Sequence, residues 1–128
     1  MTPWLTRWLA AVGGVVVLAT SGCSTVAEQE VGAALAAMTA DPAAACVRLA
    51  PETAEAVAKS GIDCAAVLAR FTGGAPPQVE VAGESAIARF SDHVVFLARF
   101  PQGWLVTAAG CVRDDPDPAV PYDCEVEP

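Results

Sequence analysis

Hydrophobic residues change their spacing about halfway along the chain. Between residues 26 and 40 the larger apolar positions recur at steps of three and four, the spacing of one face of an α-helix. After residue 78 apolar and polar residues alternate instead, as they do in β-strands. The stretch Gly-Gly-Ala-Pro-Pro at residues 73–77 separates the two patterns and predicts a break between a helical half and a sheet half.

Four helices are expected before this break. Asp41 is a suitable N-cap and Pro42 is favoured at a first helical position, so a second helix is predicted directly after the first. In the same way, Gly61 marks the end of a helix and Asp63 the start of the next. The predicted helices cover residues 26–40, 42–49, 53–60 and 64–71.

Four strands are expected after the break. Turn-forming pairs separate the alternating segments, so each strand should pair with the one before it in an antiparallel meander. The third strand is apolar on both faces, which predicts a central strand covered at least partly on two sides. The predicted strands cover residues 79–82, 85–90, 93–100 and 103–110. Helices followed by strands predict one α+β domain over residues 31–128, with N-terminal helices packed on one face of a sheet of about four strands.

The N-terminal segment has the layout of an export signal. Arg7 is its only charged side chain, an uncharged apolar run follows at residues 9–19, and small residues come next. The run is shorter than the roughly 20 apolar residues that a membrane-spanning helix needs. Residues 1–22 are therefore predicted to be a signal peptide.

The sequence Thr20-Ser21-Gly22-Cys23 resembles the lipobox of bacterial lipoproteins. In that family the signal peptide is cut just before a cysteine that already carries a diacylglyceryl group, and the new amino group is often acylated as well. Thr20 departs from the pattern, which usually has Leu or another aliphatic residue there. The resemblance implies a lipid on Cys23, with residues 23–30 as lipid anchor and short tether. Ordinary signal cleavage after Ser21 or Gly22, leaving Cys23 unmodified, is the alternative.

The number of cysteines agrees with a lipid on one of them. The chain has five cysteines, and an exported protein with an odd number has one without a partner. The other four permit three pairings, of which we favour Cys46 with Cys64 and Cys111 with Cys124, because each pair closes a short loop within one half of the domain. Their spacing contains neither a redox Cys-x-x-Cys motif nor a zinc-binding pattern.

Charge excludes one class of partner. The chain carries 15 acidic and seven basic residues, a net charge of −8, which would repel nucleic acid. Many of the carboxylates lie in a C-terminal stretch, residues 113–127, that lacks the spacing of a calcium loop and is expected to be a solvated loop. No metal and no cofactor are expected.

His93 is the only histidine and the one candidate for acid–base catalysis, a role that requires a pocket and a nearby carboxylate such as Asp92. Residues 103–111 and 121–124 resemble the ending of small uncharacterised lipoproteins of high-GC bacteria. The order of elements resembles the cone-shaped nuclear transport factor 2-like or cystatin-like folds. None of their active-site motifs is present, so no catalytic residue is assigned.

Three functions follow from these patterns. The leading hypothesis is a noncatalytic, lipid-anchored domain outside the cytoplasm, at the cell envelope, that binds a protein partner or a small apolar ligand. One alternative is a small enzyme that uses His93 inside a cone-shaped pocket. The other is a structural envelope protein, which would present a contiguous apolar patch for association.

Overall fold

A computed structural model describes residues 23–128, and the predicted signal peptide at residues 1–22 lies outside the described residues. The helical half contains α1 (Cys23–Ala40), α2 (Pro42–Ala45), the 3₁₀ turn η1 (Cys46–Arg48), α3 (Pro51–Ser60) and α4 (Cys64–Thr72). The four predicted helices are present, although the second is interrupted and finishes as η1. Residues 23–30, expected as a tether, lie within α1.

Local sequence explains the helix ends. The Asp41 carboxylate accepts a hydrogen bond from the Ala44 amide at 3.4 Å, and the Asp63 carboxylate accepts one from the Ala66 amide at 3.3 Å. These aspartates therefore cap α2 and α4 as the sequence predicts. Gly61 ends α3 in the left-handed conformation with φ of 72°, which glycine adopts with little steric cost.

The sheet has five strands, one more than the sequence predicted. They are β1 (Gln78–Ala82), β2 (Ser85–Arg89), β3 (Val94–Phe100), β4 (Gly103–Val112) and β5 (Asp123–Val126), antiparallel and in chain order. The prediction of a loop through the C-terminal stretch was wrong for β5. Ala109 pairs with Val126, whose side chain is 1% exposed, so burial and pairing outweigh the charge of the neighbouring residues.

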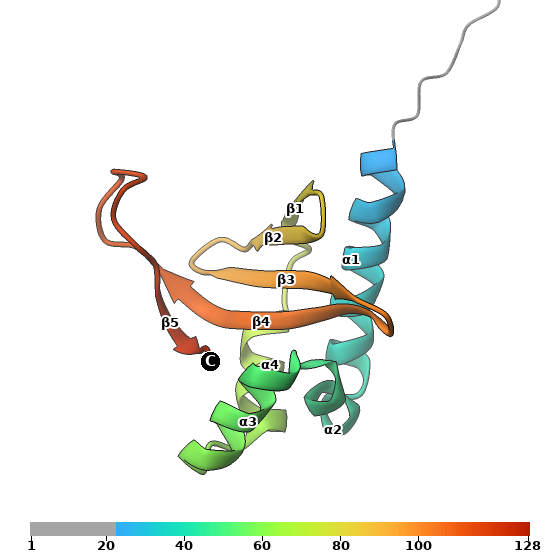
Figure 1. Cartoon of the computed structure of the whole chain (residues 1–128), viewed down its shortest axis with the longest axis vertical. Coiled ribbons are helices and arrows are strands. Elements are labelled where there is room, and N and C mark those ends of the chain that lie inside the picture. The colour runs from blue at the N-terminus through green and yellow to red at the C-terminus, as the bar shows by residue number, and fades with distance from the viewer. Residues whose placement is uncertain (1–22) are drawn as a thin grey trace, which may run out of the picture.

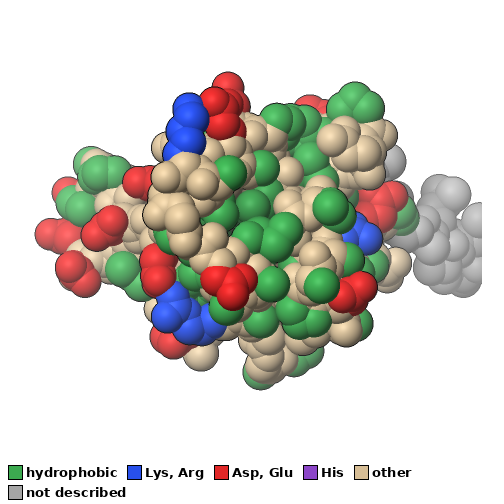
Figure 2. Space-filling view, turned by 90° about the horizontal axis from the view of Figure 1, so that it is seen from below, with side chains coloured by type: hydrophobic (Ala, Val, Ile, Leu, Met, Phe, Trp, Pro, Cys, Tyr) green, Lys and Arg blue, Asp and Glu red, His purple; other side chains and the backbone are tan. Residues whose placement is uncertain are grey.

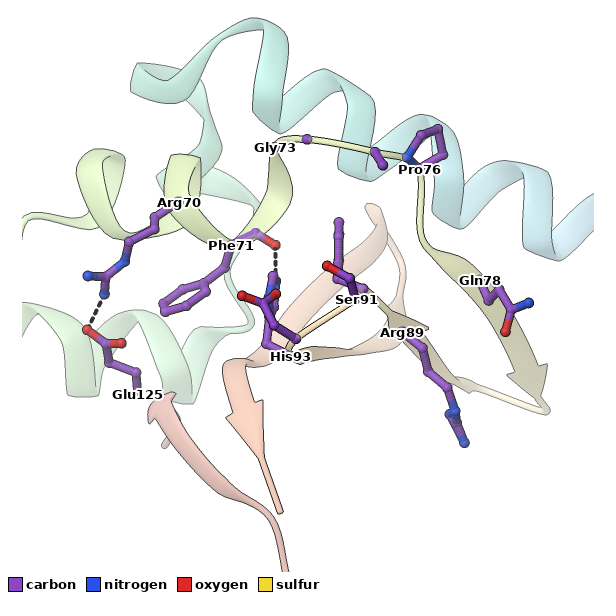
Figure 3. Close-up of a pocket in the computed structure, with 13 residues that line it drawn as sticks. Arg70, Phe71, Gly73, Pro76, Gln78, Arg89, Ser91, His93 and Glu125 are labelled. Atoms are coloured by element: carbon purple, nitrogen blue, oxygen red, sulfur yellow. Dashed lines mark hydrogen bonds and ion pairs between the residues drawn. The ribbon is translucent and has the colours of Figure 1, made fainter. Parts of the chain in front are cut away.

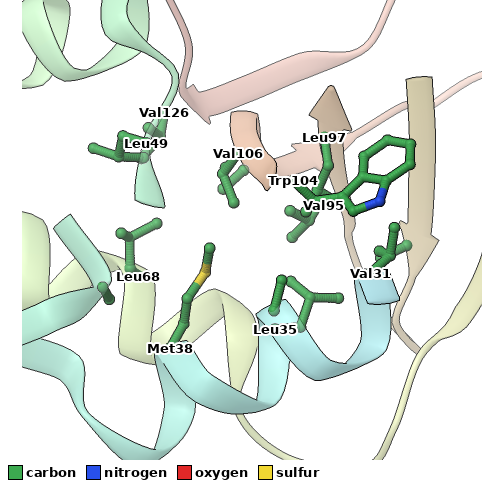
Figure 4. Packing of buried hydrophobic residues seen from close by; sticks show 14 of the residues in the cluster. Val31, Leu35, Met38, Leu49, Leu68, Val95, Leu97, Trp104, Val106 and Val126 are labelled. Atoms are coloured by element: carbon green, nitrogen blue, oxygen red, sulfur yellow. The ribbon is translucent and has the colours of Figure 1, made fainter. Parts of the chain in front are cut away.

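The helices pack on the sheet and enclose one core (Figure 1). Figure 4 shows side chains of α1 and α4 pointing toward those of β3 and β4. Each large apolar side chain buried in this way stabilises the fold by roughly 1.5–3 kcal/mol. The largest fully buried apolar side chains are Met38, Leu68, Leu97, Val31, Val95, Val106 and Val126.

The central strand β3 is covered on both faces, as its sequence predicts. Val95 and Leu97 point into the core and are 0% and 2% exposed. Between them Phe96 points to the opposite face, where its ring meets the edge of Tyr122 with 5.2 Å between centroids. Tyr122 comes from the loop between β4 and β5. This loop therefore covers Phe96 on the second face of β3 through an aromatic contact.

Two disulfides join the pairs that the sequence favoured. Cys46 pairs with Cys64, linking η1 to α4, and Cys111 pairs with Cys124, linking β4 to β5. Each bridge lies within one half of the domain and restricts the unfolded chain. Between residues 23 and 128, none of the helices is both long enough and apolar enough to span a bilayer.

The close approach of Phe71 on α4 to Gly110 on β4 predicts a difference between two glycines. Gly61 and Gly110 both have positive φ, at 72° and 66°, but a Cβ at Gly61 would meet nothing within 4 Å, whereas one at Gly110 would lie 2.5 Å from the Phe71 ring. Gly61→Ala should cost about 1 kcal/mol of unfolding free energy from backbone strain alone. Gly110→Ala should cost about 1–3 kcal/mol more because the Phe71 ring must move. Urea unfolding of both oxidised variants measures the difference, and equal losses would show that Phe71 does not pack closely there.

Candidate functional site

An open cleft of about 850 Å³ lies between the two halves of the domain. Its walls are the end of α4, residues 73–76, the ends of β1 and β2, the turn before β3, and β5 (Figure 3). Phe71, Phe90 and His93 supply aromatic surface, and Arg70 and Glu125 stand at one side. We call this hollow the main cleft.

His93 forms part of the cleft wall, and each of its ring nitrogens contacts an oxygen atom of the protein. Nε2 lies 2.9 Å from the backbone carbonyl of Phe71, near the end of α4, and Nδ1 lies 2.7 Å from the Asp92 carboxylate. The ring stacks on Phe90 at 4.6 Å and meets the edge of Phe71 at 5.2 Å. Its side chain is only 11% exposed, so His93 fastens the turn before β3 to the last turn of α4.

The two partners of His93 define what its ring can do. The Phe71 carbonyl and the Asp92 carboxylate are both acceptors, and a neutral imidazole has one N–H to donate. The tautomer decides which of these two acceptors receives that hydrogen. The enzyme hypothesis requires a pocket and a carboxylate beside His93, and both are present. However, no ring nitrogen is left to take a proton from a substrate unless the contact with Phe71 or Asp92 breaks.

The arginines of the main cleft are paired with carboxylates. Arg70 forms an ion pair with Glu125 and also lies over the Phe71 ring, 4.7 Å from its centroid. Arg89 lies 3.7 Å from Glu80. All four side chains are between 45% and 72% exposed. Because water screens exposed charges, each ion pair contributes at most about 1 kcal/mol to stability. The main cleft therefore combines paired charges with aromatic surface.

A second hollow is smaller and apolar. It has a volume of about 400 Å³ and lies between α1 and residues 72–79. Leu35 and Ala36 line it from α1, and Pro77 and Val79 line it from the opposite wall. We call it the α1 groove. The segment of residues 74–76 borders both hollows, so it separates the main cleft from the α1 groove.

The predicted site residues end up in different places. Cys23 is the first residue of α1, and the four other cysteines form the disulfides. His93 is brought together with Asp92, as the enzyme hypothesis requires. The sequence analysis did not predict the contact between His93 and Phe71. The two residues are 22 positions apart, and no local sequence pattern indicates a contact at that separation.

Comparisons with protein-family models, curated proteins and solved structures gave no match to this chain. The resemblances to lipoproteins and to the nuclear transport factor 2-like or cystatin-like folds therefore stay predictions. Within residues 23–128 no group of three or more His, Cys, Asp or Glu side chains is placed to hold a metal ion.

The contact between Asp92 and His93 predicts a dependence of stability on pH. The pKa of Asp92 is lowered in the folded protein, chiefly because the His93 ring hydrogen-bonds to the carboxylate. Such a carboxyl stabilises the fold above its unfolded-state pKa, and the stabilisation is lost as pH falls through the folded-state pKa. Asp92→Asn should therefore be slightly less stable than wild type at neutral pH, and the gap should close below about pH 4.

Urea unfolding of wild type and Asp92→Asn across the acid range measures this gap. Asp114→Asn, in the exposed loop between β4 and β5, tests whether losing a surface carboxylate is enough to produce it. A gap that is constant with pH, or that Asp114→Asn reproduces, would contradict the role of the contact with His93.

Proposed function

We propose that this chain is a noncatalytic domain that is held by a lipid on Cys23 at the cell envelope, outside the cytoplasm, and binds a small apolar ligand or a protein partner there. The observation that carries the proposal is the distribution of the five cysteines. Four of them pair within the folded domain, and Cys23 stands apart at the start of α1. Structural disulfides are typical of proteins in oxidising compartments.

The position of Cys23 supports an anchoring role. It is the first residue of α1, whose 18 residues continue from there into the packed domain. A helix of that length extends about 27 Å. A lipid on Cys23 would therefore attach directly to a rigid element and would leave the sheet and both hollows free. Stable membrane attachment needs about two acyl chains, which a diacylglyceryl group supplies.

The surface charge does not attach the domain to a membrane by itself. Figure 2 shows Asp and Glu side chains dispersed over one face, with fewer Lys and Arg side chains among them. With a net charge of −8, the chain gains no electrostatic attraction from anionic lipid headgroups, so attachment would depend on the lipid.

The hollows favour binding over catalysis. The α1 groove has the size and apolar lining of a site for a small ligand. The main cleft contains the one histidine, but its ring nitrogens are held by Phe71 and Asp92. The enzyme hypothesis remains the second candidate because the contact of His93 with Asp92 resembles a base and its orienting group. It requires His93 to release the Phe71 carbonyl when substrate binds.

Replacing the lipidation residue tests the proposed anchor. The wild-type chain, expressed in a bacterium with lipoprotein processing, should partition with the membrane fraction. Cys23→Ser removes the sulfur that carries the lipid and should move the domain into the soluble fraction. Ser24→Ala, at the neighbouring position, is the matched control and should stay with the membrane.

Intact mass spectrometry of the extracted wild-type protein tests the chemistry separately. We expect a chain that begins at Cys23, carries the mass of the acyl groups, and lacks the four thiol hydrogens lost in the two disulfides. A mature chain that begins after Cys23, or that has Cys23 with a free thiol, would refute the anchor.

A further inference from the structure

The α1 groove differs from the main cleft in the chemistry of its walls. The main cleft has arginine, histidine and carboxylate side chains, whereas none of the described residues that line the α1 groove is charged. An ionised ligand entering the groove would lose hydration without gaining an opposite charge. The absence of charge therefore selects against ions.

The hydroxyl groups at the groove have already donated their hydrogens within the protein. Thr39 Oγ1 donates to the Thr72 carbonyl at 2.8 Å, and Thr72 Oγ1 donates to the Leu68 carbonyl at 2.8 Å. Both oxygens keep lone pairs that can accept. These side chains therefore offer a ligand no hydroxyl donor, and they can accept a hydrogen bond from a ligand hydroxyl.

Small residues on α1 leave the groove open. Gly32, Ala36 and Ala40 lie at four-residue steps on the helix surface and all line the groove. Beneath them Leu35, which is 3% exposed, also belongs to the core, so the floor of the groove is continuous with the packed interior. A Cβ added at Gly32 would meet no atom within 4 Å, which means that a larger side chain there enters free space.

The opposite wall is an irregular segment, residues 73–77, which Figure 3 shows running beside α1 from Gly73 to Pro76. Among the described residues, the main-chain hydrogen bonds found outside helices and strands include none from this segment. Gly74 has φ of 91°, and two prolines follow it. Packing therefore holds this wall in place without a hydrogen-bonded ladder.

We propose that the α1 groove is a binding site for one small, uncharged, apolar molecule of the hydrocarbon or fatty-alcohol class. This inference rests on the proposed binding function and names its site and ligand class. The apolar body of the ligand lies against Leu35 and Val79, and a ligand hydroxyl donates to Thr39 or Thr72. A volume of about 400 Å³ is within the range of small-molecule pockets.

Two probes of equal length test the ligand class. The full chain with Cys23→Ser, purified without detergent, is titrated with 1-octanol and with octanoate while its backbone amide signals are followed by NMR. We expect saturable shifts from 1-octanol at Leu35, Ala36, Thr39, Ala75 and Val79, which line the groove. Octanoate should bind at least about tenfold more weakly, because its carboxylate finds no cation there. Shifts centred on residues 89–93 of the main cleft, no saturable binding of 1-octanol, or equal binding of octanoate would overturn the proposal.

Filling the groove tests the site. Gly32→Leu should weaken 1-octanol binding by about tenfold or more, because the new side chain occupies the space of the ligand. Ala33→Leu adds the same kind of side chain at the exposed neighbouring position, which does not line the groove, and should leave affinity unchanged. Ala36→Leu, also in the groove, repeats the test should Gly32→Leu alter the fold. Unchanged affinity in a folded groove variant would refute the site.

These measurements are independent of the anchor, because Cys23→Ser lacks the lipid in either case. If 1-octanol does not bind the groove but the wild-type chain is acylated and membrane-bound, only this ligand and site are rejected. If 1-octanol binds the groove but the wild-type chain is not acylated, only the anchor is rejected.

Discussion

The long strand β4 is the element on which the rest of the structure depends, because it contacts both neighbouring strands and also α1, α3, α4 and η1. Its first half pairs with β3 on one edge and receives the amide of Ala50, which donates to the Val106 carbonyl at 2.8 Å, on the other. Thr53 at the start of α3 donates to the Thr107 carbonyl, also at 2.8 Å. Its second half pairs with β5 and is fixed by the disulfide of Cys111 and Cys124. Two hydrogen bonds thus attach Ala50 and the start of α3 to this one strand.

The register between β4 and β3 is irregular. Its pairing with β3 shifts between Val94 and Leu97, where a regular ladder would place different residues opposite each other. Nearby, Gly110 takes a positive φ and lies against the Phe71 ring. The bulged strand therefore allows α4 to approach the sheet closely, and the same approach brings the Phe71 carbonyl within reach of His93.

One irregular segment separates the charged main cleft from the apolar α1 groove. Residues 74–76 border both hollows, with charged and aromatic side chains on one side and small apolar residues on the other. In the main cleft the charged and aromatic side chains contact one another: Arg70 pairs with Glu125, and His93 pairs with Phe71 and Asp92. Such a cleft is suited to holding the two halves together. The apolar groove, in contrast, has surface that a ligand can still cover.

The sequence alone determined the features that depend on neighbouring residues. Helix caps at Asp41 and Asp63, the end of α3 at Gly61 and the first four strands follow from local hydrogen bonding and side-chain periodicity, and the disulfide pairs follow from the division into halves. Tertiary structure decided the rest. β5 is short and flanked by acidic residues, and it exists because Val126 is buried beside Ala109. The contact of His93 with the Phe71 carbonyl and the two walls of the groove join segments distant in sequence, which only the packing of helices against the sheet brings within contact distance.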